Sequence, residues 1–356
     1  MARIVVTKSL SGGLVAFFEE SASTLSMAFQ PVPGTWSHLN PAITLSAGGH
    51  FVPSTLAFGD NSGQPVFGVV VTAPGIPAAL TLMTNTGTAA ATNQPQFTQS
   101  SVPAPSGFTP SMLALGAGNQ TMVANASHVF AVHNTAGITA SSWAPVGLPS
   151  GVTVRALALS TSKLFGAVPE AFVLTNTAVL HSTANTAGVW APFTTLNTPV
   201  PARGIAVLPN GNNLVDAVIL ANDGRILHAH QTVQGSAPAF LDWHPLPALN
   251  QPVVSSAATS NSLALARVLG SGSLPLLTVF VTAQNGAVFT AQQYAPDSNV
   301  WNAWRPLPLP PPDVFTSVAA SPGATTLVDV ITASANLFHS QQNVSAFDPW
   351  AQFPRG

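Results

Sequence analysis

A motif of about 50 residues recurs along the whole chain of 356 residues, which is the sequence signature of repeat architectures. Its clearest copies cover Leu214–Leu246, Leu276–Leu307 and Leu327–Trp350. Each copy contains an apolar strand, a turn, a short strand that ends near a Gln, a polar loop, a Trp and a short apolar stretch. A unit of this size cannot bury its apolar surface alone, so the copies are expected to pack against one another.

Two landmarks count the copies. Short strands of small residues begin at Ile4, Leu56, Leu113, Leu157, Ile205, Ser256 and Val318, with spacings of 52, 57, 44, 48, 51 and 62 residues. An aromatic residue recurs with the same period, at Trp36, Phe97, Trp143, Trp190, Trp243, Trp304 and Trp350. We therefore predict a single domain, residues 1–356, with seven copies at 1–50, 51–108, 109–152, 153–200, 201–251, 252–312 and 313–356.

Within each copy the pattern is that of β-strands. Runs rich in Val, Thr and Phe alternate with period two and are bounded by turn pairs such as Asp223-Gly224 and Asn285-Gly286. No stretch shows a sustained helical period. Four short strands in each copy of about 50 residues predict an all-β fold, a seven-bladed β-propeller with four antiparallel strands per blade.

The position of each strand within a blade follows from crowding at the centre of a propeller. The strand that contains alanine is expected to be innermost, and the Trp then falls on or just before the outermost strand. With this phase the chain begins with an innermost strand and ends with an outermost one. In the alternative phase, the N-terminal strand completes the last blade.

Composition limits the partners of the chain. Charged residues make up 6% of it, and nine Lys and Arg cannot form the basic face that phosphates require, so we expect no nucleic-acid partner. The longest apolar runs, such as Leu274–Val281, are interrupted by Pro and Thr, far short of the roughly 20 residues of a membrane span.

The compartment follows from two further features. Cysteine is absent, which excludes disulfides and fits a reducing environment. Lys8, Gly12 and Glu19 interrupt any apolar core of a cleavable signal peptide. We therefore expect cytoplasmic synthesis, with release to the exterior or the cell surface by another route.

The pattern D-G-x-(L/I)-L-H-x-x-Q followed by W-x-x-(L/P), clearest from Asp223 to Trp243, resembles the repeat of bacterial seven-bladed propeller lectins. The type member of that family is the fucose-binding lectin of Photorhabdus, and the pattern is also similar to the tectonin repeat. The resemblance implies glycan partners: multivalent binding of fucose-like or O-methylated sugars in clefts between adjacent blades.

Seven tryptophans are candidate sugar-binding residues. An indole ring offers a flat apolar face to a sugar ring, together with an N–H donor. The structural alternative is that each Trp fills the gap between neighbouring blades. Both interpretations predict the repetition, so the sequence leaves both open. The candidates are Trp36, Trp143, Trp190, Trp243, Trp301, Trp304 and Trp350.

Histidines and glutamines form a second candidate set. A neutral imidazole can bond a sugar hydroxyl, with a nearby Gln assisting. The structural alternative is a half-buried His that bonds a neighbouring carbonyl. The candidates are His181, His228 and His339, which share one register, and Gln231, Gln293 and Gln342. Other copies carry Met27, Ala131 and Thr290 in the His register.

Three functions are compatible with this pattern. The first is a non-catalytic lectin, and the second is a scaffold that binds another protein or its own copies as a homo-oligomer. The third, a glycoside hydrolase or lyase, needs two carboxylates across one bond, whereas Asp216 and Asp329 recur at one strand position and are expected to brace their blades. We expect no catalytic residue, no cofactor and no metal, since His228 and His230 have no carboxylate close in sequence.

The copies are not equal. Copies four to seven keep the Trp and most of the His and Gln positions, whereas copy two has Phe97 and no matching His. We therefore expect sugar in clefts lined by Trp190, Trp243, Trp304 or Trp350, and none beside Phe97.

Overall fold

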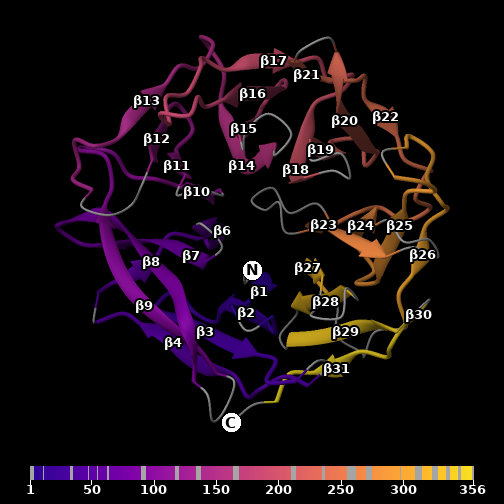
Figure 1. Ribbon diagram of the computed structural model, residues 1–356, viewed down its shortest axis with the longest axis horizontal. Helices are drawn as coiled ribbons and strands as arrows, with labels where there is room; N and C mark the ends of the chain where they lie inside the picture. The colour runs from indigo at the N-terminus through magenta and orange to yellow at the C-terminus, as the bar shows by residue number, and fades with distance from the viewer. Residues whose placement is uncertain are drawn as a thin grey trace.

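The computed structural model is a ring of seven twisted β-sheets around a central channel (Figure 1). It confirms the predicted all-β, seven-bladed propeller with four antiparallel strands per blade. None of the described segments forms a helix that could cross a bilayer. The structure describes residues 4–10, 12–32, 35–46, 48–53, 55–61, 64–89, 94–116, 120–133, 138–162, 168–209, 214–234, 237–254, 262–269, 275–296, 298–308, 315–322, 328–333, 337–343 and 346–354.

Blades are numbered in chain order, and the strands of the first four follow one another along the chain. Blade 1 contains β1 (Ile4–Lys8), β2 (Leu14–Glu19), β3 (Thr24–Phe29) and β4 (Asn40–Thr44). Blade 2 contains β5 (His50–Phe51), β6 (Ala57–Asn61), β7 (Gln64–Ala73), β8 (Ile76–Ala89) and β9 (Gln94–Pro103). Blade 3 contains β10 (Met112–Leu115), β11 (Gln120–Ala124), β12 (Val129–His133) and β13 (Ala144–Val146). Blade 4 contains β14 (Val154–Ser162), β15 (Val168–Thr175), β16 (Val179–Thr183) and β17 (Thr194–Leu196).

The last three blades repeat this order. Blade 5 contains β18 (Ala202–Pro209), β19 (Val215–Ala221), β20 (Ile226–Gln234), β21 (Ala237–Phe240) and β22 (His244–Pro245). Blade 6 contains β23 (Leu263–Leu269), β24 (Pro275–Thr282), β25 (Val288–Gln292) and β26 (Arg305–Pro306). Blade 7 contains β27 (Ser317–Pro322), β28 (Val328–Ala333), β29 (Leu337–Asn343), β30 (Ala346–Phe347) and β31 (Ala351–Gln352). In blades 2, 5 and 7 two short segments share one of the four strand positions.

The core of the protein lies between blades. Alternate residues of a strand point to opposite faces of its sheet, and therefore to opposite neighbouring blades. In β20, Ile226 packs in the apolar cluster shared with blade 6, whereas Leu227 packs in the cluster shared with blade 4. Each blade is thus apolar on both faces. Because a neighbouring blade covers each face, the sheets need few charged residues.

Small residues line the central channel. Ala57, Ala114, Ala158, Ala206, Ala264 and Ala319 all lie on its wall. The short strand expected from Ser256 lies outside the described residues, and the innermost strand of blade 6 is instead β23. Its Leu-Ala-Leu at 263–265 repeats the Leu-Ala-Leu of 113–115 and 157–159 more closely than the segment at Ser256 does.

The ring closes between blades 7 and 1 without exchange of a strand among the described residues. β1 lies innermost in blade 1, near the centre of Figure 1, and β31 lies at the rim of the ring. The first of the two predicted phases is therefore correct. Side chains join the ends: Trp36 packs on Phe353 with ring centroids 4.9 Å apart, and the Leu39 amide donates to the Pro354 carbonyl at 3.1 Å.

Candidate functional site

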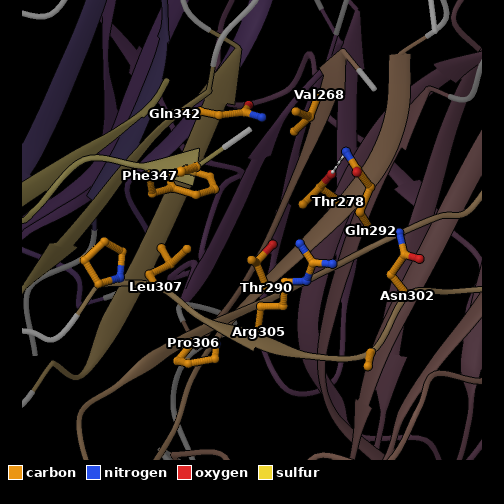
Figure 2. A pocket seen from close by; sticks show the side chains of 13 residues that line it. Val268, Thr278, Thr290, Gln292, Asn302, Arg305, Pro306, Leu307, Gln342 and Phe347 are labelled. Carbon is orange, nitrogen blue, oxygen red and sulfur yellow. Dashed lines mark hydrogen bonds between the residues drawn. The ribbon is translucent and has the colours of Figure 1, made fainter. Parts of the chain in front are cut away.

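A cleft of about 370 Å³ opens between blades 6 and 7. We call it the 6–7 cleft. Polar side chains line its blade 6 side, and Gln342 and Phe347 face them from blade 7 (Figure 2). Its lining residues are Val268, Thr278, Thr290, Gln292, Asn302, Ala303, Arg305, Pro306, Leu307, Pro308, Gln342, Ala346 and Phe347.

Strand pairing decides which side chains form the polar wall. Residues directly opposite each other in antiparallel strands share a face. Thr278 of β24 lies opposite Gln292 of β25, and Thr290 lies opposite Arg305 of β26. The Gln292 side-chain amide donates to the Thr278 hydroxyl at 3.2 Å (Figure 2). The wall thus presents hydroxyl, amide and guanidinium groups, and the described lining contains no Asp or Glu.

An apolar wall faces these groups. Phe347 stands against Phe280, with ring centroids 5.9 Å apart and an interplanar angle of 85°. Leu307 and Pro306 continue this surface (Figure 2). A cleft with one polar and one apolar wall suits a small ligand that carries hydroxyl groups on one side and C–H groups on the other.

One position, which we call the His position, distinguishes this interface from those that follow blades 4, 5 and 7. Strand pairing places Thr290 at the same point of its blade as His181 of blade 4 and His228 of blade 5. Each imidazole points toward the following blade and contacts an aromatic ring there: His181 with Phe240 at 5.4 Å, His228 with Trp301 at 5.2 Å and His339 with Trp36 at 6.1 Å, measured between ring centroids. Thr290 lacks a ring, so the corresponding space remains empty.

Two of the three predicted histidines bind buried carboxylates. His181 Nε2 lies 2.7 Å from Glu170 Oε2, and His228 Nε2 lies 3.0 Å from Asp216 Oδ1. Both carboxylates are fully buried, and Asp216 also accepts from Arg267 at 3.0 Å. The structural alternative had a carbonyl as the partner, whereas the partner is a carboxylate.

His339 differs from the other two. It packs between Trp36 and Phe353, and its Nδ1 is buried without a hydrogen-bond partner among the described residues. Burial lowers the pKa of His339 to about 4 from its ordinary value of 6.5. The imidazole is therefore neutral at pH 7 and serves as a packing group between blades 7 and 1.

The three predicted glutamines are placed differently. Gln231 and Gln293 accept from the backbone N–H at the start of the second strand of their own blades, Val215 at 3.0 Å and Leu277 at 3.2 Å. Gln231 also donates to Glu170 of blade 4 at 2.6 Å. Of the residues predicted to bind sugar, Gln342 alone is in the described lining of the 6–7 cleft.

The predicted tryptophans pack toward the preceding blade. Four of them, Trp143, Trp243, Trp304 and Trp350, immediately precede an outermost strand of their blade. The indole N–H groups of Trp143, Trp304 and Trp350 donate to the carbonyls of Pro103, Pro247 and Pro308 at 2.7–2.9 Å. Trp36, Trp143 and Trp301 are buried, and Trp190, Trp243, Trp304 and Trp350 are half-buried in the clusters between blades. None of the seven lies in the described lining of the 6–7 cleft. This geometry agrees with the structural alternative.

The sequence interpretation missed most of the cleft. It identified Gln293, whereas the adjacent Gln292 enters the cleft, because neighbouring residues of a strand face opposite blades. It also missed Thr278, Arg305 and Phe347. One signal was available: a small residue, Thr290, stands where other copies have an imidazole.

No family model and no curated protein matches the sequence. Solved structures do match. AofleA from Arthrobotrys oligospora has a TM-score of 0.54 at 10% identity, over 100% of this chain and 90% of that chain. The SapL1 lectin in complex with alpha methyl fucoside has a TM-score of 0.51 at 11% identity, over 99% and 94%.

Two further structures have the same TM-score of 0.51. A fungal lectin from Aleuria aurantia, described as a six-bladed β-propeller with a fucose recognition mode, is 14% identical over 100% of this chain and 96% of that chain. The NanB sialidase from Streptococcus pneumoniae is 9% identical over 94% and 65%. At these identities the comparisons establish the propeller fold.

Proposed function

We propose that this protein is a non-catalytic carbohydrate-binding propeller, and that the 6–7 cleft holds a neutral monosaccharide of the fucose-like or O-methylated type. The observation that carries the proposal is the pairing of a polar wall, Thr290, Gln292 and Arg305, with an apolar wall at Phe347. A volume of about 370 Å³ is within the usual range of small-ligand pockets.

Each wall has a part in recognition. Arg305 has donors only, Gln292 and Gln342 have donors and acceptors, and Thr290 has a hydroxyl that does both, so together they satisfy several sugar hydroxyls. The methyl group of a 6-deoxy or O-methylated sugar gains by leaving water for the face of Phe347 or Leu307. SapL1 is described in complex with alpha methyl fucoside and the Aleuria lectin with a fucose recognition mode, which supports the choice of sugar.

Binding without turnover is the favoured mode. Glycoside hydrolysis uses a pair of carboxyl groups across the scissile bond, and the described lining of the 6–7 cleft has none. Glu170 of blade 4 and Asp216 of blade 5 are buried in other interfaces. Glu170 is bonded by His181 and Gln231, and Asp216 by His228 and Arg267. Turnover of a chromogenic glycoside would contradict this part of the proposal.

Calorimetric titration with α-methyl fucoside tests the site. We expect a dissociation constant in the range of roughly millimolar to micromolar, and at least about tenfold weaker binding in Arg305→Ala and Gln342→Ala, since each removes a hydrogen-bonding group. The matched control is Thr194→Ala, because Thr194 of blade 4 lies opposite His181 as Arg305 lies opposite Thr290. Unchanged affinity in both cleft variants would overturn the assignment.

We also propose that the sites are multivalent and unequal, with the 6–7 cleft the strongest. The other interfaces that keep a Trp are expected to bind more weakly, because an imidazole or Met occupies the His position in several of them. A stoichiometry above one supports this. If this chain binds a partner protein that carries no glycan, and free monosaccharide does not inhibit that binding, the scaffold function is favoured instead.

A further inference from the structure

A second and larger cavity, of about 800 Å³, lies between blades 5 and 6. We call it the 5–6 cavity. It sits beside the Asp223-Gly224 turn that joins β19 to β20, and the segment from Pro245 to Val253 forms much of its wall. Two of the nine basic residues of the chain, Arg203 and Arg225, line it. In a chain with so few charges, two guanidinium groups in one cavity call for a physical explanation.

Arg203 reaches the cavity through an irregularity of its strand. The register of β18 against β19 shifts between Ala202 and Gly204, so Arg203 is the extra residue of a β-bulge. Bulges re-aim a side chain out of the normal alternation of a strand. Its Nη2 donates to the Val253 carbonyl at 3.3 Å, and its Nε is buried without a partner among the described residues.

The charge of Arg203 is not balanced locally. Asp223 is the acid in the described lining, and it receives hydrogen bonds from Arg225, whose Nε lies 2.8 Å from the Asp223 carboxylate. These bonds lower the pKa of Asp223, while partial burial lowers the pKa of Arg203 against the opposing effect of the Asp223 charge. Two cations and one anion leave one positive charge in excess beside apolar walls.

We propose that the 5–6 cavity binds an oxyanion, a carboxylate or sulfate group carried by a small ligand. A guanidinium matches the planar, two-oxygen face of such a group and bonds it more strongly than it bonds a carbonyl. The cavity is larger than an oxyanion alone requires, and Leu246, Leu249 and Pro252 provide a surface for an apolar or sugar-like body. The site is separate from the 6–7 cleft and does not depend on it.

Blade 4 provides a matched comparison. Arg155 is the bulged residue of β14, between Val154 and Ala156, at the same point of the repeat as Arg203. Arg155 is exposed and lies outside the described lining of the cavity. Substitution of Arg155 therefore serves as a control. It removes an arginine from the equivalent bulge, at a place outside the described lining of the 5–6 cavity.

Titration of the full chain with methyl β-glucuronide, methyl β-glucoside and sodium sulfate tests the proposal. We expect the glucuronide to bind and the neutral glucoside, which has the same ring, to bind at least about tenfold more weakly, since a charge-assisted hydrogen bond is lost. Binding by sulfate alone would show that the oxyanion suffices, whereas binding by glucuronide alone would assign the site to carboxylates. Equal binding of glucuronide and glucoside would overturn the proposal.

Three variants locate the site. Arg203→Gln should weaken glucuronide binding at least about tenfold, and Arg155→Gln should leave it unchanged. If Arg203→Gln does not fold, Arg225→Gln tests the site at an exposed position. It removes one cation and leaves the Asp223 carboxylate without its ion-pair partner, so an anionic ligand should bind more weakly. Retained affinity in Arg225→Gln, or equal loss in Arg155→Gln, would contradict the site. Titration of each variant with α-methyl fucoside separates this result from the 6–7 cleft.

Discussion

The interface between blades 4 and 5 and the interface between blades 6 and 7 use the same three positions with opposite results. In the 4–5 interface these positions hold Glu170, His181 and Gln231, and the side chains bond one another: Glu170 Oε2 lies 2.7 Å from His181 and 2.6 Å from Gln231. In the 6–7 interface strand pairing gives Thr278, Thr290 and Gln342 at the same positions.

A shared aromatic residue makes the difference clear. Phe240 lies opposite Gln231 in blade 5, and Phe347 lies opposite Gln342 in blade 7. Phe240 packs on the His181 ring at 5.4 Å, whereas Phe347 faces the cleft. Long side chains that pair with one another close an interface, and two short hydroxyl residues at the same positions leave a cavity. The repeat thus replaces a closed side-chain contact with an open cleft by reducing side-chain volume.

The largest expected effect concerns stability. His181→Ala leaves the buried Glu170 side chain without one of its two hydrogen-bond partners, and an unsatisfied buried polar group costs about 1–3 kcal/mol, more where it is charged. The equivalent change in the open interface, Thr290→Ala, should cost less than about 1 kcal/mol, because no buried charge depends on it. Urea unfolding of both variants, followed by tryptophan fluorescence, measures the difference. Equal losses of unfolding free energy would contradict the claim that side-chain bonds close the 4–5 interface and are missing from the 6–7 interface.

The next effect concerns acid. His339 occupies the His position without a described carboxylate partner, and burial lowers its pKa to about 4 from 6.5. The unfolded chain therefore binds more protons than the folded chain between these values, and the stability contributed by the neutral ring is complete above pH 6.5 and falls as the pH drops toward 4. We expect a loss of about 2 kcal/mol in unfolding free energy between pH 7 and pH 4.5 that is absent in His339→Phe. The same pH dependence in the variant would assign the acid sensitivity to other groups.

A third effect converts the open interface into the closed one. The double variant Thr278→Glu/Thr290→His installs the Glu and His of blade 4 next to Gln342, which corresponds to Gln231. We expect the new side chains to fill the 6–7 cleft and to weaken binding of α-methyl fucoside at least about tenfold, or about 1.4 kcal/mol. Calorimetry on the folded variant measures this, with Thr290→Ser as the control that keeps the hydroxyl. Unchanged binding would show that the sugar site lies elsewhere.

The sequence predicted the fold well because the propeller is set by features that recur in every copy. A Leu/Ile/Val-Ala pair in six copies and a Trp in six copies indicate the number of blades, and period-two alternation indicates strands rather than helices. The same repetition drew the site prediction to residues that also pack between blades, and their binding of sugar stays a prediction. Residues present in most copies, such as Trp143 and Gln231, hold blades together, as their bonds to Pro103 and Glu170 show.

The cleft depends on what one copy lacks, which repetition conceals. Thr290 indicates an open interface only when it is compared with His181 at the same position. Gln292 can be assigned to the cleft only when it is known which face of the sheet it lies on. Strand direction and face are set by pairing, and a shift of one residue reverses them. Arg203 is a further case, because a bulge places it in the 5–6 cavity and single-sequence alternation cannot reveal a bulge.

The smallest expected effect is that of salt on sugar binding in the 6–7 cleft. It tests whether the open interface binds its ligand without net charge attraction, in contrast to the closed interface with its buried Glu170. A fucose-type sugar has no net charge, and the groups that meet it are hydroxyls, amides and the guanidinium of Arg305. A hydrogen bond from Arg305 to a hydroxyl acts at contact, well inside the Debye length of about 10 Å at 0.1 M salt, so mobile ions do little to weaken it. We therefore expect the dissociation constant for α-methyl fucoside to change by less than about twofold between about 0.02 M and about 0.5 M NaCl. Calorimetry at the two salt concentrations, with Arg305→Ala measured alongside, checks this. A steep loss of affinity with salt that disappears in Arg305→Ala would show that the cleft works through charge, and its proposed ligand would then have to be anionic rather than neutral.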